Sequence, residues 1–169
     1  MLGQTYESQV CSIARALELV GERWSLLIIR DALFAGTTRY VEFQRRLGIA
    51  TNILQSRLDG FVSAGIMQRR TGSPAGPEYV LTDKGRDLAP ALIALTQWGD
   101  RWAAPDGPPV RYTHQRCGTP ARVDITCASC GTLTGPGEVL ARPGPGMPAE
   151  HAERMAVARA GGRRTNKKR

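Results

Sequence analysis

Four side chains between residues 114 and 130 have the types and spacing of zinc ligands. His114 is followed after two residues by Cys117, and nine residues later Cys127 and Cys130 form a second pair with the same gap. Imidazole and thiolate ligands in two close pairs suit tetrahedral Zn²⁺, and a short hairpin between the pairs is typical of a zinc ribbon. Glycines directly after Cys117 and Cys130 favour tight turns. We therefore predict a structural zinc site with no open position for catalysis.

Two other interpretations of this cluster remain open. The four residues can be the remnant of a zinc ribbon without metal, or Cys127 and Cys130 can form a redox-active dithiol. The βαβ context that usually surrounds such a dithiol is not evident in the sequence. These alternatives correspond to a thiol-redox protein and to a zinc-ribbon module that binds protein or RNA.

Other catalytic constellations are not found. The chain has two histidines, His114 and His151, and no GxSxG, HExxH, Walker-A or GxGxxG motif. His114 belongs to the cluster, and His151 falls on a predicted surface helix. We therefore predict that the protein is not an enzyme.

The elements that precede the cluster follow a specific order. Apolar residues recur at helical spacing in four successive segments between residues 13 and 65, each ended by a glycine. Thr38 and Thr51 are predicted to cap the third and fourth helices. Alternating runs at 66–71 and 78–81, joined by GSPAGP, predict a hairpin. A last long helix is predicted from Thr82, with a stripe that ends at Trp98 and Trp102.

This order predicts a mainly α winged helix-turn-helix fold with a small β-hairpin wing, followed by a zinc-ribbon-like β hairpin. We divide the chain into a flexible N-terminal segment over 1–10, a DNA-binding and dimerisation domain over 11–104, the His/Cys hairpin over 105–135, and a Pro/Gly linker, short helix and basic tail over 136–169. The sequence carries neither a long apolar membrane span nor a secretion signal. We expect a cytoplasmic protein with reduced cysteines.

The charge of the chain favours a polyanionic partner. The net charge is +8, and it falls to +3 without the five cations of the last nine residues, GGRRTNKKR. Basic proteins bind nucleic acid with release of counterions, although a modest positive charge also serves solubility alone. Charge therefore supports a nucleic-acid partner without proving it.

The fourth predicted helix has two chemically different faces. Leu54, Leu58 and Phe61 recur on an apolar face that can anchor the helix. Asparagine and glutamine on the opposite face can bind adenine edges in the major groove of double-stranded DNA. The predicted reading residues are Thr51, Asn52, Gln55, Ser56 and Arg57. The predicted phosphate-binding residues are Arg39, Arg45, Arg46, Arg69 and Arg70. Taken singly, each polar residue is better explained as part of a solvated helix face; the helix before them and the hairpin after them reverse this and favour DNA.

Several segments of the chain resemble regulators of the HxlR type. They are CSIARALELVGERWSLLIIRDAL from Cys11, RYVEFQ from Arg39, GIATNILQSRL from Gly48, AGI from Ala64 and YVLTDKG from Tyr79. The similarity spans residues 11–102 with consistent spacing. It implies a homodimeric winged-helix protein whose first and last helices make dimer contacts, and which regulates nearby genes. We expect a repressor on a near-palindromic operator, with Trp98 in the core and Trp102 either in the core or at the dimer seam.

Cys11 occupies the position at which some HxlR-type proteins carry a cysteine that senses oxidants or electrophiles. A thiol near a helix N-terminus can have a depressed pKa and greater reactivity, and Arg15 one turn later could add to the effect. The alternative is a small buried side chain that fills a gap under the helix. Cys11 is thus a candidate redox sensor, and an electrophile or another small molecule is a candidate effector.

Overall fold

The computed structural model describes residues 6, 9–72, 74, 76–133 and 135–155. The chain divides into two compact units, Arg15–Val123 and a second unit made of Met1–Ala14 with Asp124–Arg169. The predicted flexible segment at 1–10 lies largely outside the described residues, and the basic tail lies wholly outside them.

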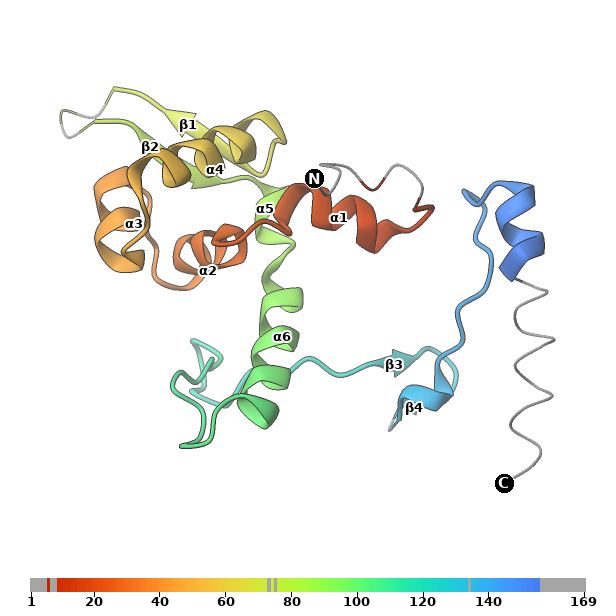
Figure 1. Ribbon diagram of the computed structural model, residues 1–169. Helices are drawn as coiled ribbons and strands as arrows, with labels where there is room; N and C mark the ends of the chain where they lie inside the picture. The colour runs from red at the N-terminus through yellow and green to blue at the C-terminus, as the bar shows by residue number, and fades with distance from the viewer. Residues whose placement is uncertain (1–5, 7–8, 73, 75, 134, 156–169) are drawn as a thin grey trace. The chain divides into compact units, whose positions relative to one another are not determined.

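The predicted order of helices and hairpin is confirmed (Figure 1). The elements are α1 (Ser12–Val20), α2 (Ser25–Phe34), α3 (Tyr40–Leu47), α4 (Thr51–Ser63), β1 (Met67–Arg70), β2 (Glu78–Leu81), α5 (Asp83–Arg86) and α6 (Ala89–Trp102). Strands β1 and β2 pair antiparallel, with Met67 opposite Leu81 and Arg70 opposite Glu78. The fold is therefore mainly helical with a two-stranded wing.

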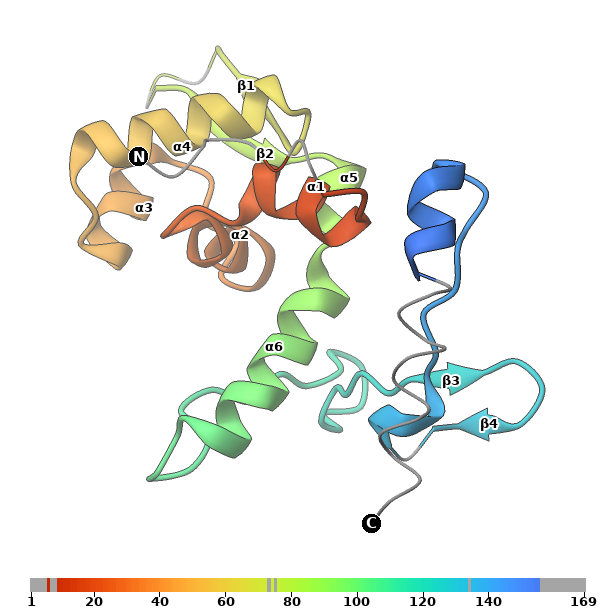
Figure 2. The same ribbon diagram turned by 45° about the vertical axis from the view of Figure 1, so that its right-hand side comes forward.

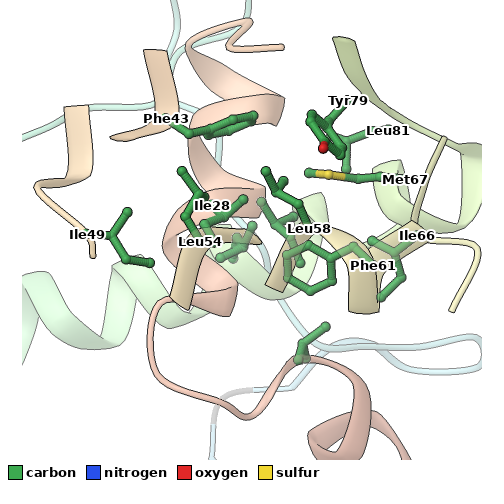
Figure 3. Packing of buried hydrophobic residues seen from close by; sticks show 13 residues of the cluster. Ile28, Phe43, Ile49, Leu54, Leu58, Phe61, Ile66, Met67, Tyr79 and Leu81 are labelled. Atoms are coloured by element: carbon green, nitrogen blue, oxygen red, sulfur yellow. The ribbon is translucent and has the colours of Figure 1, made fainter. Parts of the chain in front are cut away.

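The hydrophobic core gathers one face of α4 against α2, α3 and the wing (Figure 3). Leu54 and Leu58 are completely buried, and Phe61 is 2% exposed. Full burial of a side chain of this size contributes about 1.5–3 kcal/mol, so this face fixes the rotation of α4 about its axis. The other labelled core residues are Ile28, Phe43, Ile49, Ile66, Met67, Tyr79 and Leu81.

Two predicted helix caps are wrong. α3 begins after Arg39 and α4 after Ala50, and neither N-cap side chain accepts a hydrogen bond from its described helix. Thr38 lies one residue earlier, where its carbonyl accepts the N–H of Tyr79 at 2.7 Å. That contact holds Thr38 against the wing, one residue before Arg39, the N-cap of α3. Thr51 is already the first residue of α4.

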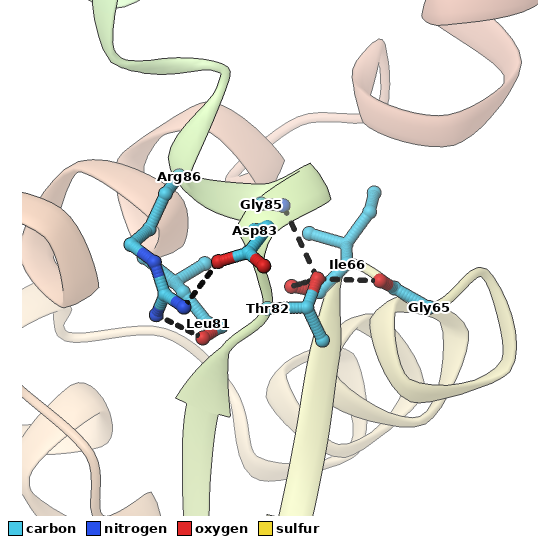
Figure 4. Close-up of polar contacts among 7 residues, drawn as sticks. All are labelled: Gly65, Ile66, Leu81, Thr82, Asp83, Gly85 and Arg86. Atoms are coloured by element: carbon cyan, nitrogen blue, oxygen red, sulfur yellow. Dashed lines mark hydrogen bonds and ion pairs between the residues drawn. The ribbon is translucent and has the colours of Figure 1, made fainter.

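Thr82, from which the last helix is predicted to start, is the N-cap of α5 and joins the wing to that helix (Figure 4). The Thr82 hydroxyl accepts the N–H of Gly85 at 3.3 Å and donates to the carbonyl oxygen of Gly65 at 2.7 Å. Arg86 donates to the carbonyl oxygen of Leu81 at 2.6 Å and pairs with Asp83 at 2.7 Å. These bonds fix the chain where it leaves β2.

The predicted long last helix is interrupted. α5 ends at Arg86, and α6 begins at Ala89 with Pro90 in its first turn. Proline has no N–H to donate to the preceding turn, so a continuous helix through this point would lose a hydrogen bond.

The apolar side chains along the stripe of α6 differ in exposure. Leu92 is buried in the core at 7% exposure. Trp98 is 60% exposed and Trp102 is 65% exposed, so the prediction that Trp98 lies in the core is wrong. The apolar side chains that follow Leu92 on this stripe are exposed, beginning with Leu95 at 51%.

The chain after α6 folds back onto the same unit. We call residues 109–123 the strap. The ring of Tyr112 lies 4.4 Å from that of Phe34 on α2. The Gln97 side chain accepts the N–H of Val123 at 2.7 Å and donates to its carbonyl oxygen at 3.3 Å. Through these contacts the compact unit extends to Val123, beyond residue 104, where the sequence predicts the DNA-binding domain to end.

The second unit contains a small hairpin, β3 (Thr126–Cys127) with β4 (Gly131–Thr132), paired antiparallel. A 3-10 turn follows at Pro136–Glu138, and residues 149–155 are helical. The rest of the short helix predicted from residue 149 lies outside the described residues. Among the helices that the structure describes, none has the length and apolar character needed to cross a membrane.

Candidate DNA-binding interface

The connection between α3 and α4 is a tight helix-turn-helix. Gly48 ends α3 in the left-handed conformation, at φ 61°, and its N–H binds the carbonyl oxygen of Gln44 at 2.9 Å. Glycine adopts this conformation without the strain that a Cβ brings. The hydroxyl of Tyr40 donates to the carbonyl oxygen of Thr51 at 2.8 Å. The first turn of α4 is therefore held in place by α3.

The predicted reading residues lie together on α4. Figure 2 shows α4 beside the wing, with α3 leading into it. Thr51, Asn52, Gln55 and Ser56 are exposed in the first turns of α4, whereas Leu54 and Leu58 of the same helix are buried. One anchored face and one polar, solvent-accessible face is the arrangement that a recognition helix needs.

One reading residue already has a partner on its own helix. Gln55 Nε2 donates to Asp59 Oδ1 at 2.9 Å, at the spacing of one helical turn. This contact can hold the amide in a fixed rotamer, so that its oxygen stays available as an acceptor. Asp59 was not among the predicted site residues, although an acid one turn after Gln55 is visible in the sequence.

Arg57 is half-buried and pairs with a residue outside α4. Its Nη2 pairs with Glu22 Oε2 at 3.2 Å, and its Nε is buried without a hydrogen-bond partner among the described residues. Arg57 therefore fastens α4 to the segment between α1 and α2. Its side chain contacts that segment, and Ser56 borders the same small pocket as Arg57 and Glu22.

The predicted phosphate-binding arginines are in different surroundings. Arg69 and Arg70 are exposed on β1, and Arg45 is exposed on α3. Arg39 pairs with Glu78 at 3.4 Å, which joins the start of α3 to the wing. Arg46 donates from Nε to Asp31 Oδ2 at 3.1 Å. Arg45, Arg69 and Arg70 are thus the members of this set that suit phosphate contacts best.

Cys11 lies directly before α1 and is exposed, so the alternative of a buried gap-filling side chain is wrong. The backbone N–H of Ala14 and then that of Ile13 lower the pKa of the Cys11 thiol. Helix N-terminal N–H groups stabilise a thiolate in this way. Arg15 forms an ion pair with Glu18 at 3.1 Å.

The first His/Cys pair lies on a turn of the strap. His114 Nδ1 is 3.1 Å from Cys117 Sγ, and Gly118 follows at φ 72°. The Thr119 hydroxyl and then the Thr119 N–H lower the pKa of Cys117 to about 7, with a smaller effect from His114. The His114 imidazole and the Cys117 thiol are therefore within hydrogen-bonding distance of each other.

The second pair lies on the β3–β4 hairpin. The backbone N–H groups of Ser129 and then Cys130 lower the pKa of Cys127, while the contact with Cys127 raises the pKa of Cys130. Gly131 follows at φ 87°. In the part of the chain that the structure describes, no three His, Cys, Asp or Glu side chains are grouped as a metal site. Zinc binding by His114, Cys117, Cys127 and Cys130 stays a prediction.

Comparison with known proteins identifies the family of the chain. The model of the HxlR-like helix-turn-helix family matches residues 19–107. The chain is 44% identical over 144 residues to Rv3095 of Mycobacterium tuberculosis, an uncharacterized HTH-type transcriptional regulator. The matched region covers 83% of this chain and 90% of that protein. The chain is 31% identical over 103 residues to the regulator YvaP of Bacillus subtilis, covering 59% and 94%.

Two solved structures are similar over most of the chain. PA1607, described as a candidate transcription factor, has a TM-score of 0.72 at 40% identity and covers 82% of this chain and 99% of its own. PA1374 from Pseudomonas aeruginosa has a TM-score of 0.60 at 39% identity, with coverage of 85% and 99%. With a family match across the helix-turn-helix and the wing, the chain belongs to the HxlR-like helix-turn-helix family of DNA-binding transcriptional regulators.

Proposed function

We propose that this regulator acts as a homodimer that binds a near-palindromic operator with α4 in the major groove and represses transcription. The observation that carries the proposal is the anchored geometry of α4. Its buried face fixes the helix, and its first turns expose Thr51, Asn52, Gln55 and Ser56. Amide side chains in the first turns of such a helix can form paired hydrogen bonds with adenine.

The apolar surface of α6 supports the dimer. Leu95, Trp98 and Trp102 are 51%, 60% and 65% exposed, and they recur along one side of the helix. Large apolar patches of this kind are uncommon on monomers and mark interaction sites. A two-fold dimer would set two α4 helices about one DNA turn apart, which fits a palindromic operator.

Repression follows from occupancy. A dimer on an operator that overlaps a promoter excludes RNA polymerase, and no activating surface is needed. Release from the operator then requires a signal, for which a thiol-reactive compound acting at Cys11 or a small-molecule ligand are the candidates. A promoter-reporter assay with and without the regulator measures the sign of regulation directly.

The direct test is DNA binding by the full chain. Duplexes are selected from a random pool by the wild-type protein, and the dissociation constant for the selected duplex is measured by fluorescence anisotropy. Combined replacement of Asn52, Gln55 and Ser56 by alanine should weaken binding to the selected duplex about 100-fold and leave weak non-selective binding. Ser63→Ala, at the far end of the same helix, is the matched control and should bind as wild type.

A second pair of variants separates phosphate contacts from base contacts. Arg69→Ala with Arg70→Ala should weaken binding to all duplexes alike and lower the salt slope of the affinity by about two. The preferred sequence should not change. Selective binding that survives the triple alanine replacement in a folded dimer would refute the proposed function.

A further inference from the structure

A cavity of about 520 Å³ lies inside the unit Arg15–Val123, where the strap covers α2 and α6. Pro109, Val110 and Tyr112 of the strap form one wall, and the contact of Tyr112 with Phe34 closes one side. Cavities that bind small ligands are usually of this size. The cavity is thus large enough for a bicyclic aromatic compound.

The walls of this cavity are mainly apolar. Leu27, Leu95 and Val110 border it and are 39%, 51% and 55% exposed. Phe34 and Tyr112 add aromatic surface, which favours stacking on a flat ring. These walls favour a planar apolar body in the occupant.

One end of the cavity is basic. Arg30 and Arg46 border it together with Asp31, so its charged lining consists of two guanidinium groups and one carboxylate. Asp31 Oδ1 accepts from Arg30 Nη2 at 2.7 Å, and Asp31 Oδ2 accepts from Arg46 Nε at 3.1 Å. The side chains of Arg30 and Arg46 remain 40% and 47% exposed. The excess positive charge favours an anionic group at this end.

We propose that this cavity binds an aromatic carboxylate. The carboxylate lies at Arg30 and Arg46, and the ring packs with the Phe34–Tyr112 pair on one side and the aliphatic wall on the other. Guanidinium groups bind carboxylates through paired, charge-assisted hydrogen bonds. The cavity depends on the strap, which begins at residue 109, whereas the family match ends at residue 107. The site is therefore an addition to the helix-turn-helix core.

The same cavity adjoins the DNA-binding elements. Arg46 belongs to α3, and α3 holds the first turn of α4 through the bond from Tyr40 to Thr51. A bound carboxylate competes with Asp31 for Arg46 and so loosens the tie between α2 and α3. This second part rests on the proposed function: the ligand weakens operator binding and acts as an inducer.

Ligand binding is tested first, without DNA. Isothermal titration calorimetry of the full chain with 2-naphthoate should show saturable binding, and the uncharged 2-naphthamide should bind at least about tenfold more weakly. Arg46→Gln removes one guanidinium, and Val110→Trp fills the cavity without changing its charge. Each should weaken naphthoate binding about tenfold or more, whereas Arg45→Gln, on the same helix but away from the cavity, should leave it unchanged.

Several results would overturn the ligand site. Equal affinity for naphthoate and naphthamide would show that the basic end plays no part. No binding at millimolar naphthoate would also overturn it. If naphthoate does not bind and Val110→Trp converts dimer to monomer in sedimentation velocity, a second copy of the chain covers the cavity.

The regulatory part is tested with the selected duplex. Saturating naphthoate should raise the operator dissociation constant of wild type about fivefold or more and leave that of Val110→Trp unchanged. Unchanged operator affinity of the naphthoate-bound wild type would refute regulation by this site. Failure of the ligand-free protein to select any duplex would instead refute the proposed function, while the calorimetric result would still stand or fall by itself.

Discussion

Arg46 of α3 and Asp31 of α2 form an ion pair across two helices, with Arg46 Nε 3.1 Å from Asp31 Oδ2. The side chain of Asp31 is 3% exposed, whereas that of Arg46 is 47% exposed. A buried carboxylate needs partners for both oxygens, and Arg30 supplies the second at 2.7 Å. The pair therefore holds α3, the helix that positions α4, against α2.

Asp31→Asn should destabilise the protein by about 1–2 kcal/mol, because the neutral amide cannot bind both guanidinium groups as an anion does and the exposed arginines limit the loss. The free energy of unfolding is measured by urea denaturation. Asp87→Asn, which alters an exposed carboxylate after α5, is the control and should change stability by less than about 0.5 kcal/mol. Equal effects of both variants would show that the ion pair contributes nothing.

Gly85→Ala should also destabilise the protein, because its new Cβ would collide with the carbonyl of Ile66 and with the Leu81 side chain. Such overpacking costs about 1–3 kcal/mol. Gly60→Ala is the matched control, since a Cβ at Gly60 meets nothing within 4 Å and alanine favours the interior of α4. Thermal unfolding should show a lower midpoint for Gly85→Ala and a higher one for Gly60→Ala. A higher midpoint for both variants would contradict the close packing of Gly85 against Ile66 and Leu81.

The sequence predicts the parts of this fold that local periodicity determines. Leu54, Leu58 and Phe61 recur at helical spacing, so the buried face of α4 and its polar opposite face could be predicted directly. The glycines and the Thr82 cap also act locally. The position of Thr38 outside α3 could not be predicted from local sequence, because its carbonyl oxygen accepts the N–H of Tyr79, which lies far along the chain.

The remaining errors concern tertiary contacts. A large apolar side chain on a helical stripe, such as Trp98, has the same pattern whether it lies in the core or at an interface. The role of Asp31 depends on how α2 packs on α3, although an acid within the apolar segment SLLIIRDALF is a visible signal. The partner of Arg57 is likewise set by the placement of Glu22.

Trp98→Glu should convert the proposed dimer to monomer, because a charge in an apolar interface must be desolvated without a partner. Sedimentation velocity at micromolar concentration measures the change, and circular dichroism checks that the variant is folded. Val41→Glu places the same charge on a 66% exposed apolar residue of α3 and should leave the dimer intact. A dimer that survives Trp98→Glu would exclude this part of α6 from the interface.

Cys11 should be alkylated faster than Cys130 at pH 7.5. Backbone N–H groups lower the pKa of Cys11 from its ordinary value of 9.0, whereas Cys127 raises that of Cys130. A lower pKa means a larger thiolate fraction at neutral pH, which outweighs the modest loss of nucleophilicity. Both rates should fall as the pH falls from 9 to 7, and the ratio of the Cys11 rate to the Cys130 rate should grow. Iodoacetamide labelling of the chelator-treated chain, followed by peptide mass spectrometry, measures both rates; equal rates at pH 7.5 would contradict the effect of the helix N-terminus.

Metal content decides the chemistry of the His/Cys residues. Each pair stands on a tight turn followed by a left-handed glycine, at φ 72° for Gly118 and 87° for Gly131, which suits the ligand pairs of a zinc ribbon. We expect about one zinc per chain by plasma mass spectrometry after purification under reducing, zinc-replete conditions. Cys117→Ser and Cys127→Ser should each abolish the bound zinc, because four ligands are required. Cys11→Ser should retain it. Metal-free wild type would refute the zinc site, and the two alternatives, a redox dithiol and a ribbon without metal, would remain. A reversible disulfide between Cys127 and Cys130 would then identify the dithiol.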